Sequence, residues 1–258
     1  MAIISDKIVS GKIVSDKIQR ALVQVSDGKI AKVNAHFFKT QPGEYGYGDQ
    51  FLGVRLPQIR RIVRDYLKAA ALPDAVNLLQ SKWHEVRLSG CILMVELAQK
   101  SRKNKDEKSE EKIYRAYLRH AKRINNWDLV DVSASPIVGQ FLMRKDRSIL
   151  VNLARSNLLW ERRIAIVATW AFIKNSEPRD AFKISRLLLR DREDLIHKAC
   201  GWMLREVGKN CGLETLNQFL DENATRMPRT MLRYALEKHP EPQRKKYLKL
   251  KISKMPYL

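Results

Sequence analysis

Residues 83–93 read WHEVRLSGCIL, and similar openings recur at residues 160–170, WERRIAIVATW, and at residues 195–204, LIHKACGWML. Each stretch carries apolar residues at three- and four-residue spacing, which is typical of a helix with one buried face. Helical spacing also dominates the rest of the chain, and extended alternating segments are scarce. The sequence therefore predicts an all-α protein.

The spacing of these openings predicts a repeat. Alignment of Arg87, Arg163 and Lys198 places the first two 76 residues apart and the last two 35 residues apart, so a unit around Trp127 fits in the longer interval. Repeats of this length made of helix pairs are typical of a HEAT-like α-solenoid. We expect stacked antiparallel helix pairs with a concave basic surface, forming one domain over residues 1–258. An irregular all-α domain is the alternative.

Three segments interrupt the repeat. Residues 1–20 include IISDKIVSGKIVSDKI, a short duplication compatible with a strand pair, a helix or an unanchored tail. Residues 100–112, KSRKNKDEKSEEK, are almost wholly charged and are interpreted as an exposed loop or a frayed helix start. Residues 244–258 form a basic tail, which is either a solvated last helix or an auxiliary phosphate contact.

The composition excludes several classes of protein. With 45% apolar and 30% charged residues, the chain is expected to fold. No apolar run reaches the roughly 18 residues of a membrane span, and Lys7, Lys12 and Lys17 interrupt any secretory signal. Three cysteines without pairing motifs indicate a reducing cytoplasm. The five histidines are scattered, so we expect neither a metal site nor a cofactor.

Charge gives the first indication of a partner. The chain holds 49 Lys and Arg against 28 Asp and Glu, a formal net charge of +21. Such a surplus attracts polyanions, and nucleic acid is the commonest of them. A basic protein without a nucleic-acid partner is the alternative.

Residues 123–133, RINNWDLVDVS, place a Trp and two Asp within a basic chain. Asn126 is suited to cap a helix that begins at Trp127, and Asp128 then lies where a carboxylate stabilises the positive end of the helix dipole. Asp131 lies beyond the first turn and four residues from Trp127, on the same helix face. An indole beside a carboxylate can bind a cation. Pro136 is expected to kink or end this helix.

Four segments carry a resemblance to a known family. Residues 125–131, NNWDLVD, resemble the catalytic segment of AlkD-like alkylpurine DNA glycosylases, which are HEAT-repeat proteins. Residues 160–166, WERRIAI, resemble the helix with that family's DNA-contacting Arg, and residues 198–209, KACGWMLREVGK, resemble the segment with its second active-site Trp. Residues 37–60 are similar to the family's N-terminal helix and loop. The resemblance extends from about residue 30 to residue 240.

The resemblance implies a DNA-repair glycosylase that hydrolyses the N-glycosidic bond of cationic N3- or N7-alkylated purines in duplex DNA. Asp131 would be the catalytic carboxylate, Trp127 and Trp202 would flank the alkylated nucleotide, and Arg163 would hold a phosphate. The expected protein is a cytoplasmic monomer that associates with the nucleoid when bound to DNA.

Two alternatives stay open. A non-catalytic HEAT-repeat scaffold that binds nucleic acid or an acidic protein shares the fold and the charge, but leaves the pair of Trp127 and Asp131 unexplained. A glycosylase with another preference, such as RNA or a bulky adduct, is the second. The chain departs from the family at Phe37 and Phe38, where the family glycosylase has a Tyr, so affinity or substrate range can differ.

Overall fold

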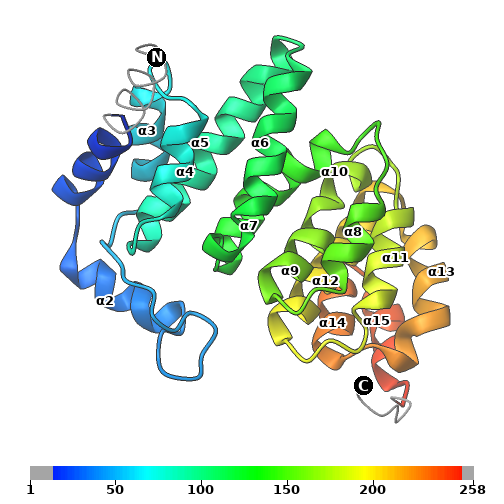
Figure 1. Ribbon diagram of the computed structural model, residues 1–258. Helices are drawn as coiled ribbons and strands as arrows, with labels where there is room; N and C mark the ends of the chain where they lie inside the picture. The colour runs from blue at the N-terminus through cyan, green and yellow to red at the C-terminus, as the bar shows by residue number, and fades with distance from the viewer. Residues whose placement is uncertain (1–13, 252–258) are drawn as a thin grey trace. The chain divides into compact units, whose positions relative to one another are not determined.

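Helices joined mostly by short turns make up the chain in the computed structural model, which describes residues 14–251, and a longer loop spans residues 38–55 (Figure 1). Within these residues the only β pairing is an isolated parallel bridge between Gln50 and Trp83. Helices that are neighbours in sequence pack against one another. The prediction of an all-α, solenoid-like class is therefore confirmed, while a concave basic surface stays a prediction. None of the described helices is long and apolar enough to cross a membrane.

The chain divides into two compact units, of which the first ends at Ser133 and the second begins at Ala134. The single domain predicted over residues 1–258 spans both units and stays a prediction.

The first unit is organised around a long helix, α5 (His84–Lys103), which is buried over most of its length. Its other helices are residues 14–24, α2 (Gly28–Phe37), α3 (Leu56–Tyr66), α4 (Leu72–Leu79), α6 (Glu107–Arg119), the 3-10 turn η1 (Ala121–Arg123) and α7 (Trp127–Ala134). α5 packs against α3, α4 and α6. A Cβ atom added at Gly90 would lie 2.9 Å from the Ala75 carbonyl oxygen, so the close approach of α4 and α5 requires glycine there.

The second unit is organised around α12 (Asp194–Asn210). It also contains the π-turn η2 (Ser135–Gly139), α8 (Ser148–Ala154), α9 (Leu159–Ala168), α10 (Trp170–Ile173), α11 (Arg179–Leu187), α13 (Leu213–Asn223), the 3-10 turn η3 (Ala224–Arg226), α14 (Arg229–Ala235) and α15 (Glu241–Lys249). α12 packs against α9, α11, α13 and α14. A Cβ atom at Gly201 would lie 2.5 Å from the Met231 carbonyl oxygen, so α12 and α14 also meet at a glycine.

A shared hydrogen-bond pattern precedes three of these helices. Ser81 accepts from the backbone N–H of Trp83 through Oγ, and its carbonyl oxygen accepts from Arg87 Nη1. Ser156 and Arg162 repeat the pattern before α9. Asp191 and His197 repeat it before α12.

This pattern corrects the predicted register of the repeat. Arg87 corresponds to Arg162 and His197, each one residue earlier than the alignment with Arg163 and Lys198. The error arises because two adjacent basic residues, Arg162 and Arg163 in α9 and His197 and Lys198 in α12, can each be aligned with Arg87. Only the first of each pair bonds to the carbonyl oxygen before its helix. In each of these three helices a basic side chain braces the helix start, while the HEAT repeat stays a prediction.

The charged segment 100–112 is mostly helical rather than a loop. α5 continues to Lys103, and α6 begins at Glu107, so only a short turn separates them. Asp106 caps α6 by accepting from the Ser109 backbone N–H at 3.0 Å. Basic residues in the last turn of α5 and acidic residues in the first turn of α6 complement the two helix dipoles. Basic residues followed by acidic residues in the sequence therefore indicate the end of one helix and the start of the next.

The two ends of the described chain are also helical. Residues 14–24 lie in a helix that buries Ile18 and Leu22 completely, whereas residues 1–13 of the N-terminal duplication lie outside the described residues. α15 covers the first part of the basic tail, and its Tyr247 is buried and donates a hydrogen bond to Asp221. This part is thus a last helix anchored to the second unit; residues 252–258 lie outside the described residues.

Candidate functional site

The helix that carries Trp127 and Asp131 begins as the sequence predicts. Asn126 is buried, and its Oδ1 accepts a hydrogen bond from the Trp127 backbone N–H at 2.8 Å. Its Nδ2 donates to Asp49 Oδ2 at 3.0 Å. The capping role of Asn126 is therefore confirmed, and the same side chain ties the start of α7 to the loop before α3.

Asp128 has a larger role than the predicted interaction with the helix dipole. Its Oδ1 accepts from the Leu129 backbone N–H, and its Oδ2 lies 2.9 Å from His84 Nε2 at the start of α5. The other ring nitrogen, His84 Nδ1, lies 3.2 Å from Asp49 Oδ2. Arg87 Nη2 donates to Asp49 Oδ1 at 2.6 Å. We call Asp49, His84, Arg87 and Asp128 the charged cluster.

The charged cluster is almost closed to solvent. The His84 side chain is 2% exposed, and those of Asp49 and Asp128 are 4% and 16% exposed. Burial acts to lower the pKa of His84, but the charge and hydrogen bond of Asp128, with those of Asp49, outweigh it and raise the pKa to about 9. Burial likewise acts to raise the pKa of Asp49, yet His84 and Arg87 hold it below its usual value.

An aromatic stack joins His84 to Trp127. The Phe38 ring lies between them, with its centroid 4.8 Å from that of His84 and 5.3 Å from that of Trp127. Phe51 stacks on His84 at 4.6 Å, and Phe37 meets Trp127 edge-on at 6.0 Å. Phe38 is buried, Trp127 is half-buried and Phe37 is 61% exposed. Trp127 therefore packs against Phe37 and Phe38, the two residues that the sequence marks only as departures from a Tyr.

Asp131 lies one turn beyond Trp127 and is half-buried. Burial raises the pKa of the Tyr117 phenol on α6, and the negative charge of Asp131 adds a smaller effect in the same direction. The Tyr117 hydroxyl lies 2.8 Å from Ser133 Oγ, which donates to the Leu129 carbonyl oxygen. These contacts anchor the rear of α7 while Asp131 keeps part of its surface accessible.

At Pro136, where the sequence predicts a kink or an end of the helix, the helix changes from α to π geometry, and the kink itself stays a prediction. α7 ends at Ala134, and residues Ser135–Gly139 widen into a π-turn that contains this proline. A wider turn accommodates the ring and the missing N–H of proline, which an α-helix cannot. α7 is therefore a short helix that ends one residue past the boundary between the two units.

In the second unit, Arg163 is buried and only 4% exposed. Its Nη1 donates to the Leu195 carbonyl oxygen at 2.6 Å, so it supports the first turn of α12. The resemblance stated above implies a phosphate contact for this residue, which stays a prediction. The structure adds a bracing role between α9 and α12.

Trp202 of α12 is half-buried, and a second indole lies beside it. The rings of Trp170 and Trp202 are 5.4 Å apart and tilted, and Lys174 Nζ lies 3.9 Å from the Trp170 ring. Trp202 Nε1 donates to Glu206 Oε1 at 3.2 Å. Trp170 is not a predicted site residue, because its contact with Trp202 joins two helices 32 residues apart and no local pattern shows it.

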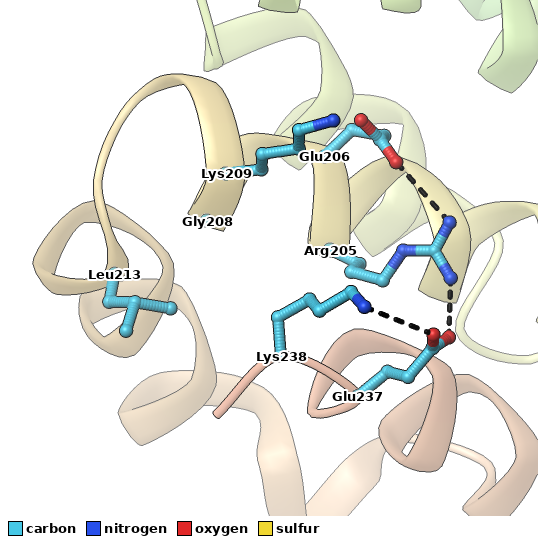
Figure 2. A pocket seen from close by; sticks show the side chains of 7 residues that line it. All are labelled: Arg205, Glu206, Gly208, Lys209, Leu213, Glu237 and Lys238. Atoms are coloured by element: carbon cyan, nitrogen blue, oxygen red, sulfur yellow. Dashed lines mark hydrogen bonds and ion pairs between the residues drawn. The ribbon is translucent and has the colours of Figure 1, made fainter. Parts of the chain in front are cut away.

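Glu206 also lines a cavity of about 630 Å³ (Figure 2). Its lining comes from α12, α13 and the segment after α14: Arg205, Glu206, Gly208, Lys209, Leu213, Glu237 and Lys238. Arg205 bridges Glu206 and Glu237 through two ion pairs. Glu206 thus connects the wall of this cavity to the indole of Trp202.

The four predicted site residues fall into two groups. Trp127 and Asp131 share α7 in the first unit, and Arg163 and Trp202 belong to the second unit. Their convergence on one surface stays a prediction.

Comparison with known proteins bears on all of these residues. The family model described as "DNA alkylation repair enzyme" matches residues 18–239, a range that includes the four predicted site residues. No curated protein matches the chain. A solved structure described as a predicted DNA alkylation repair enzyme from Enterococcus faecalis is similar with a TM-score of 0.67 and 15% identity, over 84% of this chain and 97% of that one. That likeness shows the fold, and the family model covers most of the sequence; the chain belongs to the DNA alkylation repair enzyme family.

Proposed function

We propose that this protein is a DNA glycosylase that removes cationic N3- or N7-alkylated purines from duplex DNA. The observation that carries the proposal is the pair on α7, a half-buried indole and a half-buried carboxylate one turn apart, in a chain of the DNA alkylation repair family. The net charge of +21 supports a polyanionic substrate. The free cysteines, of which Cys91 and Cys200 are buried, are compatible with work in a reducing cytoplasm as a monomer on the nucleoid.

The chemistry requires one carboxylate. An alkylated purine already carries a positive charge, so when the bond from C1′ to the base nitrogen breaks, its electron pair neutralises the base. The sugar is left with oxocarbenium character, and Asp131 stabilises that charge electrostatically. Water then adds at C1′ and loses a proton, which completes the hydrolysis. A protonated acid to assist the leaving group is unnecessary.

The other residues hold the substrate. Trp127 and Trp202 flank the alkylated nucleotide, because an aromatic face attracts a cation. Arg163 contacts a phosphate near the lesion in addition to bracing α12. Phe38 and Phe37 keep the Trp127 indole in place from within the first unit.

The test is release of methylated bases from methylated duplex DNA by the purified protein, measured against DNA without protein. We expect free 3-methyladenine or 7-methylguanine and a matching number of abasic sites. Salt-sensitive binding to the same DNA with no released base would favour the non-catalytic scaffold instead.

A further inference from the structure

We propose that His84, held as an imidazolium between Asp49 and Asp128, is a positioning residue that fixes the start of α7 and with it Trp127 and Asp131. The inference rests on the proposed function for its consequence in catalysis, but the positioning itself is a property of the first unit alone. His84 lies on α5 and does not belong to the predicted site, so it acts through the residues that it contacts.

The hydrogen bonds require the charged form of His84. An ionised carboxylate only accepts hydrogen bonds, and each ring nitrogen faces one, at 3.2 Å to Asp49 and 2.9 Å to Asp128. Both nitrogens must therefore carry a proton. The positive end of the α5 dipole opposes a cation at this position, so the two carboxylates have to offset it as well as the burial.

Within the four residues of the charged cluster, the charges balance only when His84 is protonated. Two carboxylates, Asp49 and Asp128, face one further buried cation, Arg87. A further cation, Arg123, lies nearby: burial and then the charge of Arg87 lower its pKa, while the charge of Asp49 raises it. The Glu85 carboxylate accepts hydrogen bonds from backbone N–H groups, including those of Leu52 and Gly53. The Cys91 thiol stays neutral because burial raises its pKa to about 12. Loss of the His84 proton leaves an excess negative charge in a buried site.

Two contacts couple the protonation state of His84 to the position of α7. The first is the bond to Asp128, the second residue of that helix. The second is the Phe38 ring, which stacks on both His84 and Trp127. A neutral imidazole presents a lone pair to one of its two carboxylates, so one bond is lost. The residue released is either Asp128, in the first turn of α7, or Asp49, which holds the Asn126 cap of that helix. The Trp127 indole and the Asp131 carboxylate then lose their fixed placement.

The first experiment uses the full chain and needs no substrate. Long-range proton–nitrogen spectra of the histidine rings should show His84 with both nitrogens protonated at pH 8, with a loss of that signature centred near pH 9. The indole resonance of Trp127, assigned with Trp127→Phe, should shift with the same midpoint. A neutral His84 ring at pH 7 would overturn the proposal. So would a Trp127 indole resonance whose chemical shift does not change as His84 titrates.

The second experiment measures single-turnover excision on 7-methylguanine duplex, corrected for the reaction without enzyme at each pH. The wild-type rate should fall above pH 9. His84→Gln should lower the rate at pH 7 about 10-fold or more. Its DNA affinity should change less than about 2-fold, because positioning acts on the chemical step. His120→Gln, on a half-buried histidine of the same unit, is the control and should keep the wild-type rate and pH profile.

The two experiments separate the inference from the proposed function. If the wild type releases no base, the glycosylase proposal fails, and the spectra of the wild type still decide whether His84 positions Trp127. If the wild type is active and folded His84→Gln excises at the wild-type rate, the positioning role is wrong. Should His84→Gln not fold, the pH profile of the wild type carries the test, because a flat rate through pH 9 contradicts it.

Discussion

The Nε2 atom of His84 and the Oδ2 atom of Asp128 lie 2.9 Å apart, which ties the first residue of α5 to the first turn of α7 across 44 positions of sequence. This bond changes the meaning of Asp128. A residue that the sequence assigns to the helix dipole alone is one of two anionic partners of a buried cation. The predictions below follow from that cluster, from the aromatic stack and from the proposed catalytic carboxylate.

Asp128→Asn should destabilise the fold well beyond the loss of a dipole interaction. The amide can accept one hydrogen bond from His84 but brings no charge, so the buried imidazolium loses half of its compensation. We expect a decrease of about 2 kcal/mol or more in the free energy of unfolding, the scale of a hydrogen bond to a charged group. Urea unfolding measures it. Asp65→Asn, on an exposed carboxylate of α3, should stay within about 0.5 kcal/mol, and equal effects of the two would contradict the role of Asp128.

The stability of the protein should depend on pH through His84. Its folded-state pKa is raised from 6.5 to about 9, so its contribution to stability is fully present below pH 6.5 and is lost as the pH rises through 9. The difference in unfolding free energy between wild type and His84→Gln should therefore be largest below pH 6.5 and shrink toward pH 9. Unfolding midpoints measured across this range check it, and a difference that grows with pH would contradict the sign.

Phe38→Ala should loosen Trp127. The Phe38 ring is buried against Trp127, His84 and Phe51, so its removal leaves a cavity that costs about 3–5 kcal/mol. Tryptophan emission should also shift to the red as Trp127 gains solvent. Phe37→Ala is the matched control: that ring is 61% exposed, and its loss should cost less than about 1 kcal/mol. Comparable costs at the two positions would show that the stack does not support Trp127.

Arg163→Ala should have two separable effects. Loss of the bond to the Leu195 carbonyl removes a hydrogen bond from a charged donor, which costs about 1.5–3 kcal/mol of stability. Loss of a phosphate contact should weaken DNA binding alike for all sequences and reduce the slope of log affinity against log salt by about 1. Arg155→Ala, on an exposed arginine before α9, is the control for general charge. An unchanged salt slope in folded Arg163→Ala would remove the phosphate role and leave the bracing role.

The sequence predicted the fold class because helical periodicity and repeat length are local properties that a single chain displays. The predicted register was one residue off because Arg162 and Arg163 are adjacent and alike, and only their different long-range partners distinguish them. The charged segment 100–112 was interpreted as a loop although its basic residues precede its acidic ones, the order that ends one helix and starts the next.

The candidate site was predictable only in part. Trp127 and Asp131 lie within one helix, so their spacing revealed their shared face. His84 and Asp49 were missed because their contacts with α7 are long-range, and no local pattern shows which distant side chain a buried carboxylate meets. The remaining signal was the polar pair of His84 and Glu85 at the start of a helix that is otherwise buried.

The most direct test of the account is excision of 7-methylguanine from duplex DNA by Asp131→Asn under single-turnover conditions. The amide keeps the shape of the carboxylate but not its charge. Excision should therefore fall about 100-fold or more, while DNA affinity and unfolding stay close to wild type. Asp65→Asn replaces an exposed carboxylate in the same unit and should keep the wild-type rate. If wild type and Asp131→Asn release the base equally fast, Asp131 is not the group that stabilises the developing charge and the proposed mechanism is contradicted.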